Sequence, residues 1–386
     1  MTQVNPTNKR VVVAMSGGVD SSVAAALLVE QGYEVIGMMM RLWSEPAAGA
    51  NAPANRCCTP DQMADARHIA NLLGIPFYVV DVQTYFYKQI VQFFIDEHEK
   101  GHTPNPCLQC NRKVRFTYLL EQAMALNADY LATGHYIRVQ HNGREYQVLK
   151  GVDDHKDQSY VLHMLTQEKL AHVLFPVGNY TKQQVRALAQ KYNLPVASKD
   201  ESQDLCFLGD GDYRRFLQEY SHKAAPPGPI LDQHGNELGQ HNGLPFYTIG
   251  QRKGLGISTP EPVFVLQKDV ARNALVVGSR AALGQQQLTA AQVNWLNGSP
   301  PTKPLRAQIK IRYKAQPAWG VVVDEGNGRC QVQFDEPVFG ITPGQGAVFY
   351  DGDICLGGGI ITGLVHASSA IPLPVISIPA NGGAVT

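Results

Sequence analysis

Residues 16–21, with the sequence SGGVDS, have the composition of an anion-binding loop. They stand between a β-branched run and a run of helical composition, so the backbone N–H groups of Ser16, Gly17 and Gly18 can face an anion at a helix N-terminus. The segment fits neither the Walker pattern G-x-x-x-x-G-K-[ST] nor the dinucleotide pattern G-x-G-x-x-G. A phosphate or pyrophosphate is therefore expected, with Asp20 placed to help hold Mg²⁺. The alternative is a plain glycine turn in which Asp20 caps the helix.

Cysteines form the second set of reactive groups. The chain has seven of them: Cys57, Cys58, Cys107, Cys110, Cys206, Cys330 and Cys355. The odd count and the chain length argue against a disulfide framework. Cys107 and Cys110 make a C-x-x-C just before Arg112 and Lys113, and two cations beside a helix N-terminus would lower the pKa of a thiol there.

The C-x-x-C alone leaves three interpretations open. It could be half of a zinc site completed by Cys57 and Cys58, the ligand set of an iron–sulfur cluster, or a redox dithiol. The spacing of the two cysteine pairs is not a regular cluster pattern, so a required cluster is not expected. Cys206 follows an acidic, polar loop and, taken alone, would be a small buried hydrophobic residue.

Composition sets broad limits on the class of protein. The 386 residues suffice for two or three domains, and 44% apolar and 17% charged residues are typical of a soluble globular protein. No apolar run has the length of a membrane span and the first residues contain no signal-peptide core, so a cytoplasmic location is expected. The formal net charge is zero, yet residues 303–314 carry five basic residues and no acid. The charge alone does not indicate a nucleic-acid partner.

The elements that must position these residues can be predicted from apolar runs and helix caps. Buried parallel strands are expected at residues 10–15, 33–40, 75–81 and 129–134. Helices are expected at residues 20–32, 59–74, 84–100 and about 114–126. The second of these helices has a start signal in Thr59, Pro60 and Gln62. Alternating strands and helices predict a parallel sheet with helices on both faces.

The pattern changes after about residue 210, where helical segments become rare and glycine is frequent. From about Val293 onward, short alternating runs between turn residues indicate a small β-barrel or sandwich. A hairpin is expected to turn at residues 325–328. Residues 366–386 are rich in small residues and proline and are expected to form a flexible tail.

Eight motifs occur in order along the chain: MSGGVDSSVAAALL, TPNPCLQCNRKVRF, ATGHY, KDQSYVL, LFPVG, DLCFLG, GQRKGLGI and DEPVFGITPGQGAVFYDGDICLGGGII. The first resembles the signature of the PP-loop ATP pyrophosphatases. Together they resemble the tRNA uridine 2-sulfurtransferases, also called tRNA-specific 2-thiouridylases, from about residue 10 to residue 362. The resemblance implies an α/β fold with a parallel-sheet PP-loop domain of the adenine nucleotide alpha hydrolase type, a small central domain and a C-terminal β-barrel.

The domain boundaries follow from that resemblance and from the change in composition. We expect a catalytic, ATP-binding PP-loop domain at residues 1–210 and a central tRNA-binding linker domain at residues 211–285. The C-terminal β-barrel domain is expected at residues 286–365, followed by the tail at residues 366–386.

The reaction implied by the resemblance is the ATP-dependent 2-thiolation of the wobble uridine, position 34, of tRNA. ATP would adenylate the uridine C2 oxygen, and sulfur from a cysteine persulfide would then replace that oxygen, with release of AMP and pyrophosphate. By position, Cys110 matches the nucleophile and Cys206 the persulfide carrier, with a transient disulfide between them. The persulfide could attack the base directly, or Cys110 could first release sulfide from it.

The remaining site residues are also implied by position in the motifs. The ATP-binding residues would be Ala14, Met15, Ser16, Gly17, Gly18, Val19, Asp20, Ser21, Met40 and Gly134. The residues at the target base or tRNA would be Asn105, Pro106, Cys107, His135, Lys156, Asp157, Gln158, Arg312, Tyr313 and Gln345. Cys107 is not expected to be essential to sulfur transfer.

The implied cofactors and partners complete the prediction. ATP and Mg²⁺ are expected, with sulfur carried as a protein persulfide, whereas an iron–sulfur cluster on Cys57, Cys58, Cys107 and Cys110 is the less favoured alternative. tRNA and a cysteine desulfurase or sulfur-relay protein are the expected partners, and no membrane is expected. Two rival classes are a PP-loop synthetase that adds nitrogen and a non-catalytic RNA-binding or metal-binding protein.

Overall fold

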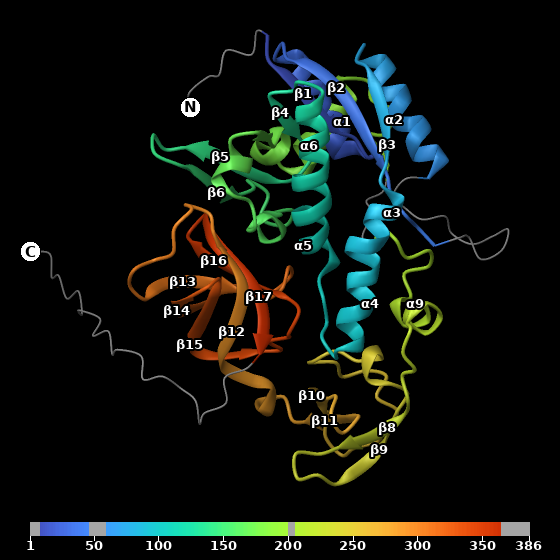
Figure 1. The fold of residues 1–386 in the computed structure, drawn as a ribbon, viewed down its shortest axis with the longest axis vertical. Coiled ribbons are helices and arrows are strands. Elements are labelled where there is room, and N and C mark those ends of the chain that lie inside the picture. The colour runs from blue at the N-terminus through green and yellow to red at the C-terminus, as the bar shows by residue number, and fades with distance from the viewer. Residues whose placement is uncertain (1–7, 46–58, 200–204, 364–386) are drawn as a thin grey trace, which may run out of the picture.

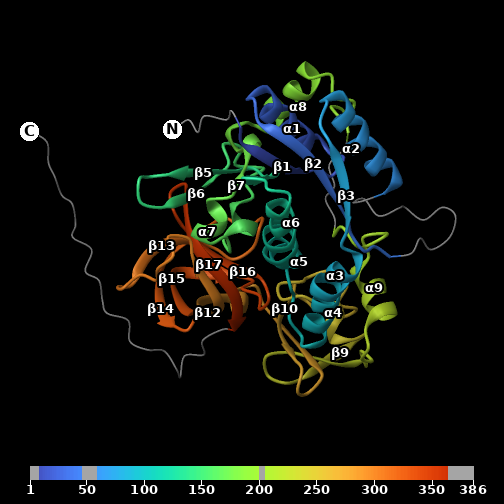
Figure 2. The ribbon, with the colours of Figure 1, turned by 45° about the horizontal axis from the view of Figure 1, so that its top comes forward.

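The computed structural model describes residues 8–45, 59–199 and 205–363. Figure 1 shows three parts: a parallel sheet with its helices at the top, a β-barrel at the lower left, and a small sheet at the bottom. A helical column that contains α5 and α6 runs between them (Figures 1 and 2). The α/β fold with a central domain and a C-terminal barrel, predicted from the sequence, is confirmed.

The N-terminal sheet has five parallel strands in the order β3-β2-β1-β4-β7. They are β1 (Arg10–Ala14), β2 (Glu34–Arg41), β3 (Phe77–Asp81), β4 (Tyr130–Ala132) and β7 (Val173–Leu174). Val11 and Val13 belong to a core with α1 (Val19–Glu30), α2 (Pro60–Leu72) and α8 (Lys182–Lys191). Val12 belongs to the core on the opposite face. Both faces of β1 are therefore buried, which explains its continuous apolar run.

Helix caps fix where the flanking helices begin and end. Thr59 and Gln62 form the predicted capping box of α2, with Pro60 in its first turn. The chain leaves α1 through Gly32, whose φ of +85° suits glycine after a helix. The four expected strands are confirmed as β1, β2, β3 and β4. The helical stretch expected between residues 84 and 100 is also confirmed and is formed by α3 (Gln83–Phe86), η1 (Tyr87–Val91) and α4 (Gln92–Glu99).

The helix expected at about residues 114–126 begins eight residues earlier, and this corrects the sequence prediction. α5 (Pro106–Cys110) runs into η2 (Asn111–Leu119), which has π-helical hydrogen bonding, and then into α6 (Leu120–Ala125). The earlier start has a local cause, because the Asn105 side chain caps α5 and Pro106 occupies its first turn. The C-x-x-C therefore lies inside a helix and not in the loop before it.

The central sheet has the order β10-β11-β8-β9 and follows α9 (Tyr213–Tyr220). Its strands are β8 (Gly228–Leu231), β9 (Glu237–His241), β10 (Phe264–Asp269) and β11 (Ala274–Gly278). The pairing of β8 with β11 is parallel and the other two pairings are antiparallel. Its buried residues join a core with α4 and α9, so this sheet is packed onto the N-terminal part of the chain.

The C-terminal part closes into a barrel. Its strands are β12 (Gly284–Trp295), β13 (Leu305–Lys310), β14 (Ala318–Gly326), β15 (Arg329–Phe339), β16 (Gly346–Asp351) and β17 (Ile354–Gly363). Pairing of β12 with both β15 and β17 closes the ring, so the barrel alternative is correct and the sandwich alternative is not. The hairpin between β14 and β15 turns at the predicted place, where Asn327 and Gly328 have positive φ.

A hairpin from the first half of the chain extends the barrel sheet. β5 (Ile137–His141) pairs with β6 (Tyr146–Lys150), and β6 pairs in turn with β17. The shorter elements are η3 (Ser159–Leu162), α7 (Gln167–Leu170), η4 (Pro176–Asn179), η5 (Leu244–Phe246) and η6 (Ala281–Leu283). Among the described residues, no helix is long and apolar enough to cross a membrane.

Candidate active site

The loop between β1 and α1 turns sharply at Gly17. This residue has a φ of +70°, and a Cβ there would lie 2.4 Å from the carbonyl oxygen of Gln62, so only glycine fits. Gly18 is the N-cap residue of α1, and Ser21 Oγ accepts a hydrogen bond of 3.2 Å from the Ser16 N–H. The glycines therefore stand at a helix N-terminus, where phosphate binds well, while the Ser16 N–H is used inside the loop.

The same edge of the sheet is closed by Gly134, which follows β4. A Cβ at Gly134 would lie 2.7 Å from the backbone nitrogen of Ser21, so the two segments touch through their backbones. β1 and β4 are neighbours, and their carboxyl ends form the edge at which open α/β sheets bind ligands. Met40, near the end of β2, is half-buried and packs against the cores on two sides.

Asp20, in the first turn of α1, meets two residues from distant parts of the chain. Lys182 Nζ lies 2.7 and 2.9 Å from its two carboxylate oxygens, and the Tyr136 hydroxyl donates to it at 2.6 Å. The Lys182 side chain is only 13% exposed. This lysine supplies positive charge beside a loop that has no lysine of its own.

A second lysine reaches the loop from the other side. Lys199 Nζ donates to the Gly17 carbonyl oxygen at 3.0 Å and forms an ion pair of 2.7 Å with Asp65. Sequence reasoning missed Lys182 and Lys199. The only signal near either was the capping box of Thr181 and Gln184, which places Lys182 at a helix start but does not say what that start faces.

His135 is buried behind Gly134. Its Nδ1 lies 2.7 Å from Thr133 Oγ1 and its Nε2 lies 3.5 Å from Arg115 Nη1. Burial, assisted by the charge of Arg115, lowers the pKa of His135 well below its ordinary value. Because the guanidinium can only donate, Nε2 acts as the acceptor and the neutral ring carries its proton on Nδ1.

α5 carries both cysteines of the C-x-x-C. The Asn105 side chain accepts hydrogen bonds from the backbone of Cys107 at 3.1 Å and of Leu108 at 3.4 Å. Cys107 is exposed, whereas Cys110 is only 6% exposed. The capping residue thus has a structural task beside the predicted contact with the target base.

η2, which follows Cys110, fastens the helix to its surroundings. The Asn111 side chain donates to the Val161 carbonyl oxygen at 3.2 Å, and the Arg112 guanidinium donates to the side chain and the carbonyl oxygen of Gln292 in β12. Arg115 in turn donates to Asn111 at 3.0 Å. π-Helical segments are uncommon and are frequent at functional sites. The helix that bears Cys110 is therefore joined to the barrel.

Cys206 lies in residues 205–212, which we call the Cys206 segment. It is half-buried and packs against a hydrophobic cluster that also contains Cys110. We call this group the thiol cluster, and its buried phenylalanines are Phe86, Phe94, Phe207, Phe216 and Phe246. The structure thus brings the two predicted reactive thiols, far apart in sequence, into one cluster.

The barrel meets the segment that leads into α5. The Thr103 N–H donates to the Pro343 carbonyl oxygen at 3.0 Å, and Gln345 Nε2 donates to the Thr103 carbonyl oxygen at 2.8 Å. Arg312 follows β13, is exposed, and donates to the Phe339 carbonyl oxygen, while the Tyr313 ring lies 6.1 Å from the Tyr160 ring. Of the predicted tRNA residues of the barrel, Gln345 therefore contacts the segment that leads into α5.

Of the predicted tRNA residues at positions 156–158, Lys156 ends a turn in which its N–H donates to the Asp153 carbonyl oxygen at 3.0 Å, and Asp157 and Gln158 follow that turn. Asp157 is buried and accepts hydrogen bonds from the backbone of Gly151 and from Ser159. Gln158 Oε1 accepts from the Tyr136 N–H at 2.9 Å. Both side chains are thus used to hold the segment that presents Lys156.

Cys330 and Cys355 are buried in the barrel, and burial raises the pKa of each thiol to about 12. They are unsuited to react as thiolates. Cys57 and Cys58, the other two ligands of the predicted cluster alternative, lie outside the described residues. Among the described residues, no group of three or more histidine, cysteine or acidic side chains is placed to hold a metal ion.

A cavity of about 290 Å³ lies at the junction of α4, α9 and the central sheet. It is lined by His98, Glu99, Ser221, Lys223, Asn242 and other residues, none of which was predicted as a site residue. It is not at the edge of the sheet that carries the phosphate loop, and that edge remains the better candidate because of its glycines, its lysines and its helix N-terminus.

Three family models match successive parts of the chain. They are described as a tRNA methyl transferase HUP domain at residues 9–210, a tRNA methyl transferase PRC-barrel domain at residues 214–279, and an aminomethyltransferase β-barrel domain at residues 285–361. A U34-tRNA thiolase from Methanococcus maripaludis has 20% identity and a TM-score of 0.34 over 57% of this chain and 66% of its own. That similarity is too low to bear on function.

Curated relatives are much closer. A tRNA-specific 2-thiouridylase of Symbiobacterium thermophilum is 50% identical over 92% of this chain and 93% of its own. The tRNA-specific 2-thiouridylases of Magnetococcus marinus and Acetivibrio thermocellus are 50% and 46% identical, over 92% of this chain and 99% of their own. The chain belongs to the tRNA-specific 2-thiouridylase family.

Proposed function

We propose that the protein is a tRNA-uridine 2-sulfurtransferase that uses ATP to thiolate the wobble uridine at C2. The observation that carries this proposal is the placement of two reactive centres: a phosphate loop at the edge of the parallel sheet, and Cys110 and Cys206 in one hydrophobic cluster. The family-model descriptions mention methyl transfer, but a loop for pyrophosphate and a pair of cysteines are what adenylation and sulfur transfer require.

The first step is adenylation of the uridine. The C2 oxygen attacks the α-phosphorus of ATP, a P–O bond to that oxygen forms, and pyrophosphate leaves with the electrons of the broken bond. The glycine loop and the N-terminus of α1 hold the β- and γ-phosphates, and Lys182 and Lys199 offset the charge that develops there. Ala14 to Ser21, Met40 and Gly134 would line the nucleotide.

Mg²⁺ fits this site through Asp20. A single carboxylate beside substrate phosphates is a usual binding mode for this ion, and the carboxylate is held in place by Tyr136 and Lys182. When bound, the ion would neutralise charge on the departing pyrophosphate.

The second step replaces the activated oxygen with sulfur from a Cys206 persulfide. In one route the Cys110 thiolate attacks Cys206 Sγ, forms the disulfide and releases hydrosulfide, which adds to C2 and expels AMP. In the other, the terminal sulfur of the persulfide attacks C2 and expels AMP, and Cys110 then cleaves the S–S link. Both routes end with a Cys110–Cys206 disulfide, which an external thiol reductant returns to two thiols with two electrons and two protons.

The tRNA would approach between the sheet and the barrel. Gln345 of the barrel contacts the segment before α5, Arg312 and Tyr313 follow β13, and Asn105, Pro106 and Cys107 begin α5. Lys156 would contact the tRNA backbone, while Asp157 and Gln158 would hold the protein segment that presents Lys156. A wobble base must be splayed out to be read and modified in such a site.

The sulfur would come from a cysteine desulfurase or a relay protein, and the enzyme would act in the cytoplasm. An iron–sulfur cluster is not needed for either route.

The proposal is tested with unmodified tRNA, ATP, Mg²⁺ and a persulfide donor, with nucleosides analysed by mass spectrometry. We expect 2-thiouridine at position 34 and equal amounts of AMP and pyrophosphate, all dependent on ATP. Aerobic and anaerobic preparations should behave alike. Incorporation of nitrogen or of a methyl group instead of sulfur, or tRNA binding without conversion of ATP to AMP, would contradict the proposal.

A further inference from the structure

The Cys206 segment has no helix or strand of its own to hold it. Residues 205–212 form only turns and bends before α9 begins at Tyr213. Backbone hydrogen bonds tie Leu208 to Leu205 and Glu45 to Phe207, the latter at 3.4 Å. The position of the Cys206 thiol must therefore be set mainly by side chains from other parts of the chain.

One of these constraints is apolar. Phe207, the residue after Cys206, is 1% exposed, and its ring lies 5.4 Å from the Phe94 ring and 5.5 Å from the Phe216 ring. This contact fixes the depth of the segment in the thiol cluster. It does not fix the direction in which the segment runs, because edge-on and tilted aromatic rings tolerate sliding and rotation more readily than charged hydrogen bonds do.

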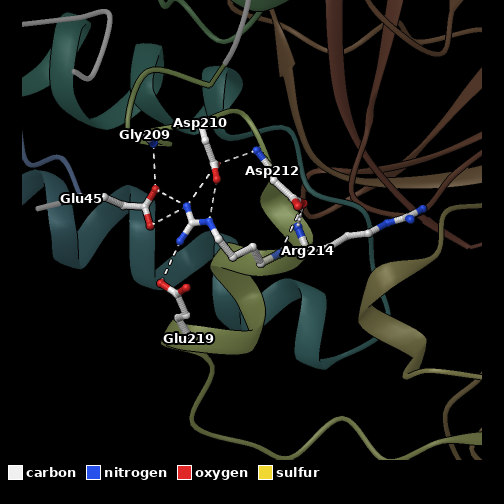
Figure 3. A network of polar contacts seen from close by, with 7 residues as sticks. Glu45, Gly209, Asp210, Asp212, Arg214 and Glu219 are labelled. Atoms are coloured by element: carbon white, nitrogen blue, oxygen red, sulfur yellow. Dashed lines mark hydrogen bonds and ion pairs between the residues drawn. The ribbon is translucent and has the colours of Figure 1, made fainter. Parts of the chain in front are cut away.

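The other constraint is a network around Arg215 of α9. Figure 3 shows Glu45, Asp210 and Glu219 converging on one guanidinium group, which belongs to Arg215 by its hydrogen bonds. Nη2 donates to both oxygens of Glu45, at 3.0 and 2.8 Å, and Nε donates to Asp210 at 2.7 Å. Glu45 also accepts the Gly209 N–H at 2.7 Å. The guanidinium thus ties the Cys206 segment to the chain that continues from β2.

The charges make Arg215 the essential member of this network. Three carboxylates surround one cation, and the Glu45 side chain is only 5% exposed. Without the guanidinium, Glu45 would be a buried anion facing Asp210 across the same gap, which is costly. Loss of Arg215 should therefore drive Asp210, and with it the Cys206 segment, away from Glu45.

We propose that Arg215 is a positioning residue for sulfur transfer, which holds the Cys206 segment so that its thiol stays in the cluster shared with Cys110. The proposal rests on the function proposed above and adds to it a residue that touches neither ATP nor the reacting atoms. It also explains why an arginine is needed: only a planar guanidinium can serve Glu45, Asp210 and Glu219 at once, and a lysine offers a single compact charge.

The chain provides a matched control in the adjacent residue. Arg214 is exposed on the same turn of α9, and Figure 3 shows its side chain directed away from Glu45. Replacing Arg214 changes the net charge of α9 as replacing Arg215 does, but leaves the network intact.

The test measures how fast Cys110 and Cys206 form a disulfide in the full-length protein when diamide is added. Diamide accepts the two electrons and two protons of the thiols, and peptide mapping identifies the linked pair. We expect the rate to fall at least about fivefold in Arg215→Lys and further in Arg215→Gln, with faster alkylation of Cys206, because the thiol loses its fixed approach. Arg214→Gln should match the wild type.

ATP binding and the thermal midpoint are measured on the same samples, and rates are compared at a temperature at which every variant is folded. Arg215→Lys is the milder change and keeps the test valid if Arg215→Gln does not fold. A lower thermal midpoint with an unchanged disulfide rate would mean that Arg215 only stabilises the fold, and would overturn the proposal.

Failure of the proposed function would look different. If Cys206→Ser retained thiolation, the sulfur route itself would be wrong, whatever the Arg215 variants did. If Cys206→Ser were inactive and Arg215→Lys formed the disulfide at the wild-type rate, the sulfur route would stand and the role of Arg215 would fall.

Discussion

Cys110 and Cys206 belong to one hydrophobic cluster, but the chain holds the two thiols in different ways. Cys110 lies in a helix whose start is defined within a few residues by Asn105 and Pro106. Cys206 lies in a segment without regular structure, which depends on contacts with Glu45, Phe94 and Arg215. One thiol is positioned by local sequence and the other by tertiary contacts.

This difference suits the two chemical roles. A nucleophile that must attack one S–S bond from a defined direction benefits from a fixed helix, because orientation contributes much of the rate. A persulfide carrier must first accept sulfur from outside and then deliver it, so a half-buried segment that is held by side chains is the better support. The predictions below separate the two regions, from the largest expected effect to the smallest.

Loss of either thiol should have the largest effect. Cys110→Ser and Cys206→Ser should each lower 2-thiouridine formation by at least about a thousandfold, because Cys206 carries the sulfur and Cys110 breaks the bond between them. Binding of ATP, measured by calorimetry, should remain. Cys107→Ser, one turn earlier on α5, is the control and should retain most activity; equal loss in that variant would point to the C-x-x-C pair as the redox unit.

Changes in the phosphate loop should affect ATP and not the thiols. Gly17→Ala places a Cβ in a left-handed conformation and 2.4 Å from the Gln62 carbonyl oxygen, so ATP affinity should fall at least about tenfold. Gly18→Ala meets only Ser16 Oγ at 3.3 Å and should have a smaller effect. The diamide-driven disulfide should form normally in both variants; a slower disulfide would show that the two centres are coupled.

Acid should act on two buried histidines before it acts on the Arg215 network. Burial lowers the pKa of His163, whose carbonyl oxygen accepts a hydrogen bond from Asn294 of β12, from 6.5 to about 4. The unfolded chain binds this proton more readily than the folded chain does. Protonation therefore lowers the free energy of unfolding by about 3 kcal/mol as the pH falls from 6.5 to 4. Buried His98, whose pKa is lowered to about 3, acts in the same direction on the side of Cys206, where its ring packs against Phe94 and Tyr213.

The Arg215 network should respond at lower pH. The guanidinium lowers the pKa of Asp210 to about 2, so its contribution is present above about pH 4 and is lost between pH 4 and 2. We expect the free energy of unfolding, measured by denaturant titration, to change less steeply with pH between 6.5 and 4 in His163→Leu than in the wild type. In Arg215→Lys its pH dependence over that range should be unchanged. A weaker pH dependence in Arg215→Lys together with an unchanged one in His163→Leu would contradict the assignment of the two groups to separate pH ranges.

The two helix caps should show the smallest effects. Asn105 caps α5, and Asp212 caps α9 by accepting from the backbone of Arg214 and Arg215. Asn105→Ala and Asp212→Ala should each lower the free energy of unfolding by about 1 kcal/mol, measured by denaturant titration. A loss several times larger at Asn105 would mean that the contact of its segment with the barrel depends on the same side chain.

The parts of the fold that were predictable from sequence are those in which one short segment carries its own signal. The β-branched run of β1, the capping box of Thr59 and the hairpin turn at Asn327 are of this kind. The pairing of β6 with β17 was not predictable, because those strands are some 200 residues apart and neither one indicates its partner. The start of α5 was missed for a different reason: Asn105 and Pro106 gave a local signal, but the prediction began the helix at about residue 114.

The candidate site shows the same division. The glycines of the loop and the cysteines were identified by residue type and spacing. Lys182, Lys199 and Arg215 were not identified. Each forms an ion pair with an acidic residue more than 100 positions away in the sequence, and a single cation in a sequence does not reveal which carboxylate it will meet.

The central claim is that Cys110 and Cys206 act as one pair in sulfur transfer. The most direct measurement is a single turnover without reductant, in which persulfide-loaded protein is mixed with ATP, Mg²⁺ and unmodified tRNA, and protein and nucleosides are analysed together by mass spectrometry. The account predicts one Cys110–Cys206 disulfide for each 2-thiouridine formed. 2-Thiouridine formed while both thiols remain open to alkylation, or a disulfide that uses Cys107 in place of Cys110, would contradict it.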